Sequence, residues 1–103
     1  MTGSVWLTHE LFARRIGEQF ALVTETETLH LVLAETWVSR EGGGLGPEGQ
    51  NRQQFSLIFD GPRGAGVPQG TYRLAHDELG DLELFLVPVG VHEGHLRYEA
   101  AFA

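Results

Sequence analysis

Apolar and polar residues alternate along most of the chain, which is the pattern of strands that bury one face. Segments rich in glycine, proline or short polar residues separate the alternating stretches and predict turns and loops. The pattern predicts six strands, over residues 19–24, 28–38, 54–60, 69–76, 81–89 and 95–103. No strand–helix–strand alternation is visible, so we expect the pairing to be antiparallel or mixed.

The alternation also assigns an inward face to most of these strands. In residues 28–38 we expect a face of leucines that continues to Trp37 near the strand end. In the last strand Arg97 and Glu99 are expected to point away from the core. The other expected inward positions are Phe20, Leu22, Phe55, Leu57, Phe59, Tyr72, Leu74, Leu96, Tyr98, Ala100 and Phe102.

Residues 81–89 form the most apolar stretch. One face carries three leucines, and the other begins with acidic residues and becomes apolar from Phe85 to Val89. A strand that is buried on both faces at its end belongs in the middle of a sheet, so we predict a central position for it. We expect the chain to turn over residues 90–94 before the last strand.

A single amphipathic helix is predicted over residues 7–17. Thr8 is suited to the N-cap, Glu10 places a carboxylate in the first turn, and Gly17 can end the helix. Phe12 belongs to its apolar stripe, which must lie against another element.

These elements predict one α+β domain, mainly β, over residues 1–103. We expect about six mostly antiparallel strands in a small barrel or curled sheet, with the N-terminal helix closing one opening. Glycine and proline predict loops over residues 40–52 and 61–68. The strands 54–60 and 95–103 are the expected sheet edges, and therefore the expected surface for self-pairing.

Composition narrows the possible partners. The content of hydrophobic residues (42%) and charged residues (20%) indicates a folded globular chain. Seven basic and fourteen acidic residues give a net charge of −7, which opposes binding to nucleic acids and anionic membranes. There is no cysteine, so disulfides and thiolate chemistry are excluded. Residues 1–6 have neither a basic nor an apolar signal region, and we expect a cytoplasmic protein without a membrane segment.

Histidines are the first candidates for chemistry. His92 and His95 flank a turn, but a zinc site needs three or four ligands on fixed supports. We therefore expect two polar residues at a hairpin tip and no metal site. His30 and His76 are expected to be solvated or to cap the ends of elements.

A carboxylate cluster is the second candidate. Glu83, Arg97 and Glu99 could face one another across the last hairpin, and paired carboxylates can act as acid and base when burial separates their pKa values. An arginine among them makes cross-strand ion pairing the commoner arrangement. We predict no catalytic residue and no cofactor, and hence a protein that is not an enzyme.

The residues proposed for interaction are aromatic or charged. Exposed tryptophans would suggest a partner surface or a sugar-stacking site, because an indole combines a large apolar face with one donor. The candidate interaction residues are Trp6, Trp37, Arg97, Tyr98 and Glu99.

Four segments resemble a family of short uncharacterised bacterial domains: PQGTYRLAH at 68–76, ELG at 78–80, LELFLVPVG at 82–90 and RYEA at 97–100. Residues near the start of the chain are also similar, namely Leu7, Thr8, Phe12, Gly17 and Phe20. The resemblance implies no established activity and no catalytic residues. Some members are encoded near phage-tail-collar-like fibre proteins, which implies an accessory or structural part in such an assembly.

Three functions remain open. The first is a non-enzymatic interaction or structural domain, as an assembly component of a phage-tail-like or surface fibre system that binds a protein partner or itself. The second is a small-ligand or sugar-binding barrel, with an apolar cleft that has Trp37 or Tyr72 at its mouth. The third is an enzyme that uses the Glu83/Arg97/Glu99 group or the histidines.

Overall fold

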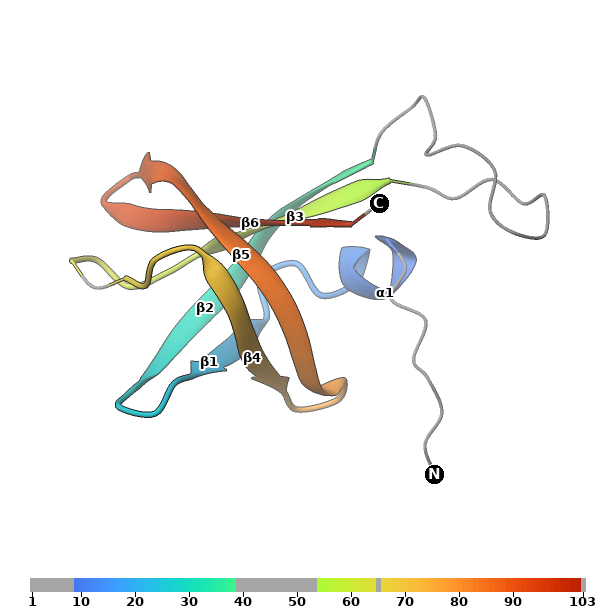
Figure 1. Cartoon of the computed structure of the whole chain (residues 1–103). Coiled ribbons are helices and arrows are strands. Elements are labelled where there is room, and N and C mark those ends of the chain that lie inside the picture. The colour runs from blue at the N-terminus through green and yellow to red at the C-terminus, as the bar shows by residue number, and fades with distance from the viewer. Residues whose placement is uncertain (1–8, 39–53, 65, 103) are drawn as a thin grey trace.

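A computed structural model describes residues 9–38, 54–64 and 66–102 of the chain. They form one short helix and six strands (Figure 1). The elements are α1 (His9–Ala13), β1 (Gln19–Val23), β2 (Thr28–Val38), β3 (Phe55–Asp60), β4 (Gly70–His76), β5 (Gly80–His92) and β6 (His95–Phe102). The predicted loop over residues 40–52, and Trp6, lie outside the described residues.

The six strands close into an antiparallel barrel in the order β1-β2-β3-β6-β5-β4. Pairing of β4 with β1, in which Leu22 lies opposite Leu74, closes the barrel. The predicted fold class is therefore confirmed in its barrel form. The predicted edges are wrong: β3 pairs with β2 and β6, and β6 pairs with β3 and β5. Closure supplies every strand with two neighbours, which leaves no open edge for self-pairing.

The inward faces follow the alternation of the sequence. Phe20 and Phe59 meet edge to face with ring centroids 5.3 Å apart, and Phe55 stacks on Phe102 at 4.5 Å. These contacts join β1, β3 and β6 across the barrel interior. The buried apolar residues are Phe12, Phe20, Leu22, Leu29, Leu31, Leu33, Phe55, Leu57, Phe59, Leu74, Leu82, Leu84, Leu86, Tyr98 and Ala100.

A β-bulge in β2 reverses the predicted orientation of Trp37. Leu33 pairs with Phe59 and Glu35 pairs with Ile58, so one extra residue of β2 lies between the two pairs. The extra residue shifts the alternation by one position. Trp37 consequently leaves the leucine face, and 61% of it is exposed.

The prediction for β5 is wrong on its outer face. Leu82, Leu84 and Leu86 are buried, whereas Phe85 and Val89 are about half exposed. In a closed barrel the outer face of a strand meets solvent unless another layer covers it, so a central and doubly buried strand does not arise.

The last hairpin also turns later than predicted. The strand β5 continues to His92, and only Glu93 and Gly94 form the turn, both with positive φ (53° and 84°). That conformation is the one that matches the twist of a two-residue hairpin. Residue 90 belongs instead to a second bulge, in which Val89 is the extra residue between the pairs that Pro88 and Gly90 make with β6.

The helix is shorter than predicted but lies where expected, at one end of the barrel beside the start of β3 and the end of β6 (Figure 1). Glu10 occupies the first turn and Gly17 follows the helix with a φ of 92°. Phe12 is completely buried and its ring lies 5.9 Å from that of Phe102. A helix of five residues has little stability of its own, so this burial holds it in place.

The segment between β3 and β4 packs closely on β6. A Cβ added to Gly66 would lie 2.5 Å from Leu96 Cδ1 and 2.6 Å from the Tyr98 hydroxyl, so a larger residue there would have to displace these side chains. The same hydroxyl accepts a hydrogen bond from the Val67 backbone amide at 3.1 Å. Nearby, the Arg63 guanidinium donates to the Glu93 carbonyl at 3.0 Å and ties this segment to the tip of the last hairpin.

Candidate functional site

His76 is the histidine that the fold buries most deeply among the described residues, with 4% of its side chain exposed. Its Nδ1 accepts hydrogen bonds from the backbone amides of Glu78 and Leu79, at 3.0 and 3.1 Å. Because Nδ1 is an acceptor, the proton is assigned to Nε2, which donates to Glu18 at 2.7 Å. Both ring nitrogens are thus engaged. Of the two alternatives predicted for His76, solvated or capping, the structure shows capping.

Arg15 connects the segment after the helix to the turn between β4 and β5. Its guanidinium pairs with Glu78 and also lies 3.5 Å from Glu18, the carboxylate that binds His76. The hydrogen bond to Glu78 raises the pKa of Arg15 above its ordinary value. The group therefore joins three segments that are distant in sequence and acts as a structural clamp.

Arg97 forms a second ion-pair group on the outer wall of the barrel. Its Nε donates to Asp60 at 2.7 Å and its Nη1 donates to Glu35 at 3.0 Å. The hydrogen bond to Asp60 raises the pKa of Arg97, and the bond to Glu35 adds to the effect. One fixed guanidinium thus bridges two strands, which stabilises the wall of β2, β3 and β6.

The predicted cluster of Glu83, Arg97 and Glu99 is not assembled. Glu83 lies opposite Arg73 of β4, and Glu99 lies opposite Val87 of β5. The bulge in β5 and the late turn change the register that the prediction assumed. The carboxylates therefore lie over different strand pairs, and Arg97 finds its partners on β2 and β3.

The remaining histidines lie at surfaces. His92 and His95 face each other at the tip of the last hairpin, as expected, and His95 donates from Nδ1 to the Gly61 carbonyl at 3.0 Å. His30 is exposed on β2. Within the parts of the chain that the structure describes, no three histidine, aspartate or glutamate side chains are placed to hold a metal ion.

The predicted interaction residues separate into three groups. Trp6 lies outside the described residues. Trp37 is well exposed, while Arg97 and Glu99 are half-buried on the outer wall. Tyr98, in contrast, is only 1% exposed and belongs to the core, so its side chain is not available at the surface.

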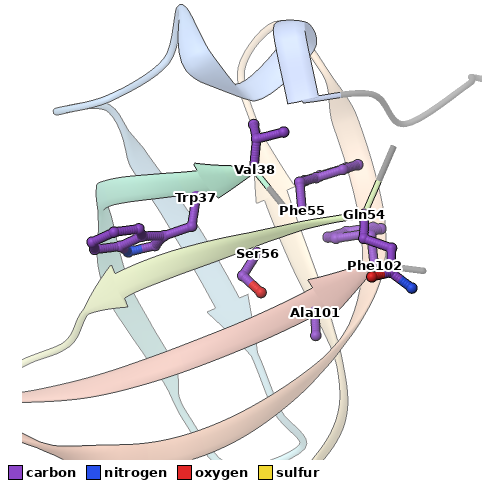
Figure 2. Close-up of a pocket in the computed structure, with 7 residues that line it drawn as sticks. All are labelled: Trp37, Val38, Gln54, Phe55, Ser56, Ala101 and Phe102. Carbon is purple, nitrogen blue, oxygen red and sulfur yellow. The ribbon is translucent and has the colours of Figure 1, made fainter. Parts of the chain in front are cut away.

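The structure brings Trp37 into a cleft of about 440 Å³ at the rim of the barrel. Trp37 lies opposite Ser56, which lies opposite Ala101, so these side chains form an outward row across β2, β3 and β6. We call this region the Trp37 cleft (Figure 2). It is lined by Trp37, Val38, Gln54, Phe55, Ser56, Ala101 and Phe102.

Sequence reasoning had identified Trp37 but not the residues beside it. Ser56 and Ala101 are small and lie in strands, so neither attracts attention by residue type. Only the pairing of residues 28–38, 54–60 and 95–103 with one another shows that Ser56 and Ala101 lie beside Trp37. The bulge at Leu33 hides that register from the sequence, because it moves Trp37 to the outer face.

A second cleft, of about 560 Å³, lies at the start of β2 and the end of β3. It is mostly apolar, with His30, Asp60 and His95 on its lining. Asp60 is already bound to Arg97 and His95 to the Gly61 carbonyl, so the polar groups of this cleft are largely occupied.

Comparison with protein families gives one match. A model described as "Domain of unknown function (DUF6916)" matches residues 7–102, which is nearly the whole chain. The chain belongs to this family. The expected membership of a family of short uncharacterised domains is therefore confirmed.

No curated protein and no solved structure matches the chain. The family match extends from the residues just before α1 to the end of β6, so all six strands of the barrel belong to the family domain. Among the described residues, no helix has the length and apolar character to cross a membrane.

Proposed function

We propose that this DUF6916 domain is a non-enzymatic interaction module that serves as an accessory or assembly component of a phage-tail-like or surface fibre system. The observation that carries the proposal is the apolar outer surface of β5. Phe85 and Val89 are 51% and 48% exposed, and the half-buried Val87 lies between them on the same face. Along a strand these positions extend over about 13 Å, and exposed apolar surface of this kind is typical of contact sites between proteins.

The chemistry of the described residues supports binding over catalysis. His76 uses both ring nitrogens in the fold, and Arg97 is held by two carboxylates. Each of these groups joins segments of the barrel to one another. They therefore serve stability, and the surface that is left for a partner is made of side chains on the outer wall.

Charge favours a different protein over a second copy as the partner. The chain carries a net charge of −7, and β5 begins and ends near acidic residues, Asp81 and Glu93. Two copies of such a surface repel each other, whereas a basic rim around an apolar centre would be complementary. The partner that fits is a fibre-system protein whose contact surface has an apolar centre and a basic rim. Nucleic acids and anionic membranes do not fit, because they are negatively charged like the chain. The cytoplasmic location stays a prediction.

The test is light scattering of the purified chain, alone and mixed with proteins encoded beside its gene. We expect a stable complex with one of them that is lost in Val89→Glu. Val23→Glu is the matched control, because Val23 is also exposed but lies on β1 opposite Arg73. A chain that stays monomeric with every neighbour, or a complex that Val89→Glu leaves intact, would refute the proposal. A homo-oligomer that Val89→Glu dissociates would assign the same surface to self-association.

A further inference from the structure

The Trp37 cleft differs from the other surface features in the groups that it leaves unoccupied. Among the described residues, the indole N–H of Trp37, the Ser56 hydroxyl and the Gln54 amide have no hydrogen-bond partner. They lie beside the small side chain of Ala101, while Phe55 and Phe102, which also line the cleft, stack on each other on the inward side of β3 and β6. The cleft thus combines one large exposed ring with a few polar groups, as small-ligand sites do.

The dimensions follow from the strand register. Trp37, Ser56 and Ala101 occupy three neighbouring strands, so the row spans two strand spacings, or about 10 Å. The small side chains of Ser56 and Ala101 leave a shelf beside the indole (Figure 2). A six-membered ring can lie on this shelf against the indole, with its edge groups toward Ser56 and Gln54.

The charge of the lining indicates the class of ligand. Among the described residues, none of the seven that line the cleft is charged, although the chain has 21 acidic and basic residues. An anionic ligand would find no counter-charge among these seven and would be repelled by the acidic protein. A cationic ligand would find no carboxylate among them. The cleft therefore suits a neutral ligand that has an apolar face and a polar edge.

We propose that the Trp37 cleft binds a neutral saccharide, with a pyranose ring stacked on the Trp37 indole and its hydroxyls bonded to Ser56 and Gln54. A sugar ring presents C–H groups on its face and hydroxyls at its edge, which matches an indole beside a hydroxyl and an amide. A proline-rich peptide fits less well, because its grooves are lined by several exposed aromatic rings. Here Phe55 and Phe102 are packed on each other and on Phe12. The inference does not rest on the proposed assembly role.

The experiment is calorimetric titration of the full chain with cellohexaose, maltohexaose and chitohexaose, each up to about 10 mM, a range suited to the weak binding of a shallow and open site. We expect at least one of them to bind. Trp37→Ala should weaken binding at least tenfold, and Trp37→Phe should weaken it less, because it keeps an aromatic face. Ala101→Arg should also weaken binding, since it fills the shelf and leaves the indole in place.

Phe85→Ala is the matched control, because Phe85 is a similarly exposed aromatic residue outside the cleft, and we expect unchanged binding. Circular dichroism of each variant checks that the barrel is intact. The proposal is overturned if none of the three saccharides binds, or if Trp37→Ala and Ala101→Arg both leave the affinity unchanged. The proposal is also overturned if decaproline binds and none of the saccharides does. The same holds if the chain forms a homodimer that Trp37→Ala dissociates and no saccharide binds.

Discussion

Phe12 offers the sharpest test of how the barrel is closed. It is the buried residue of a helix of only five residues, and its ring contacts Phe55 and Phe102 at the end of the barrel. If the helix closes the barrel through this side chain, Phe12→Ala must destabilise the whole fold. Phe85→Ala provides a matched control, because it removes the same atoms from the outer wall, where Phe85 is half exposed.

The expected magnitudes are well separated. Truncation of a buried phenylalanine to alanine costs about 3–5 kcal/mol, and we expect the lower value for Phe12, since a short helix at the rim can shift to fill part of the cavity. Phe85→Ala should cost less than about 1 kcal/mol, through lost strand propensity and partial burial. A domain of this length has a total stability of about 5–15 kcal/mol, so the first change removes a large fraction of it.

Urea unfolding followed by far-UV circular dichroism measures both free energies, and thermal unfolding gives a second estimate. For a domain of this size, about 3 kcal/mol corresponds to a fall in Tm of about 12–24 °C. Equal losses of unfolding free energy for Phe12→Ala and Phe85→Ala would refute the reasoning. The buried side chain of the helix would then stabilise the fold no more than a half-exposed side chain on the outer wall. A change in the denaturant slope would indicate that the barrel end had already opened in the native state.

Three other substitutions test separate parts of the fold. Tyr98→Phe leaves a backbone amide without its acceptor and should cost about 1 kcal/mol of unfolding free energy. The control Tyr72→Phe removes an exposed hydrogen bond to the Pro68 carbonyl and should cost less; equal losses in urea unfolding would contradict this. Glu93→Asn should raise stability by about 0.5 kcal/mol, because asparagine tolerates a φ of 53° better, and an unchanged or lower Tm would argue against the turn. Folding raises the pKa of Arg97, mainly through Asp60, so the stabilisation is present at neutral pH and is lost only as the pH rises past the ordinary arginine value. Arg97→Gln should therefore lower the free energy of unfolding by the same amount at pH about 7 and about 9. A smaller destabilisation at the higher pH would contradict this prediction.

The strands were predictable because alternation is a local property. Each position of a strand faces one side or the other, so the residues that must avoid water reveal the inward face without knowledge of the partner strand. Leu57 on β3 and Leu74 on β4 are buried as the alternation predicts. The hairpin between β1 and β2 was also predictable, although its turn lacks glycine. The Thr24 side chain accepts hydrogen bonds from the backbone amides of Thr26 and Glu27 there and stabilises the turn.

The candidate site was predictable only in part. An exposed tryptophan at the end of residues 28–38 was a candidate from residue type, and the structure places Trp37 in a cleft. The neighbours of Trp37 depend on which residues of β3 and β6 lie opposite it, and that register is a property of the paired sheet. The partners of Arg97 escaped prediction for the same reason, since Asp60 and Glu35 lie 37 and 62 residues away in sequence.

The sequence by itself thus determined the number and limits of most strands, their inward faces, the antiparallel connections and the acidic surface. Tertiary structure decided the closure of the barrel, the two bulges and the exposure of Trp37 and Phe85. The physical reason is the range of the interactions. Side-chain alternation is set by each residue and its immediate neighbours, whereas a bulge is the response of a strand to its partner and to the curvature of the closed sheet.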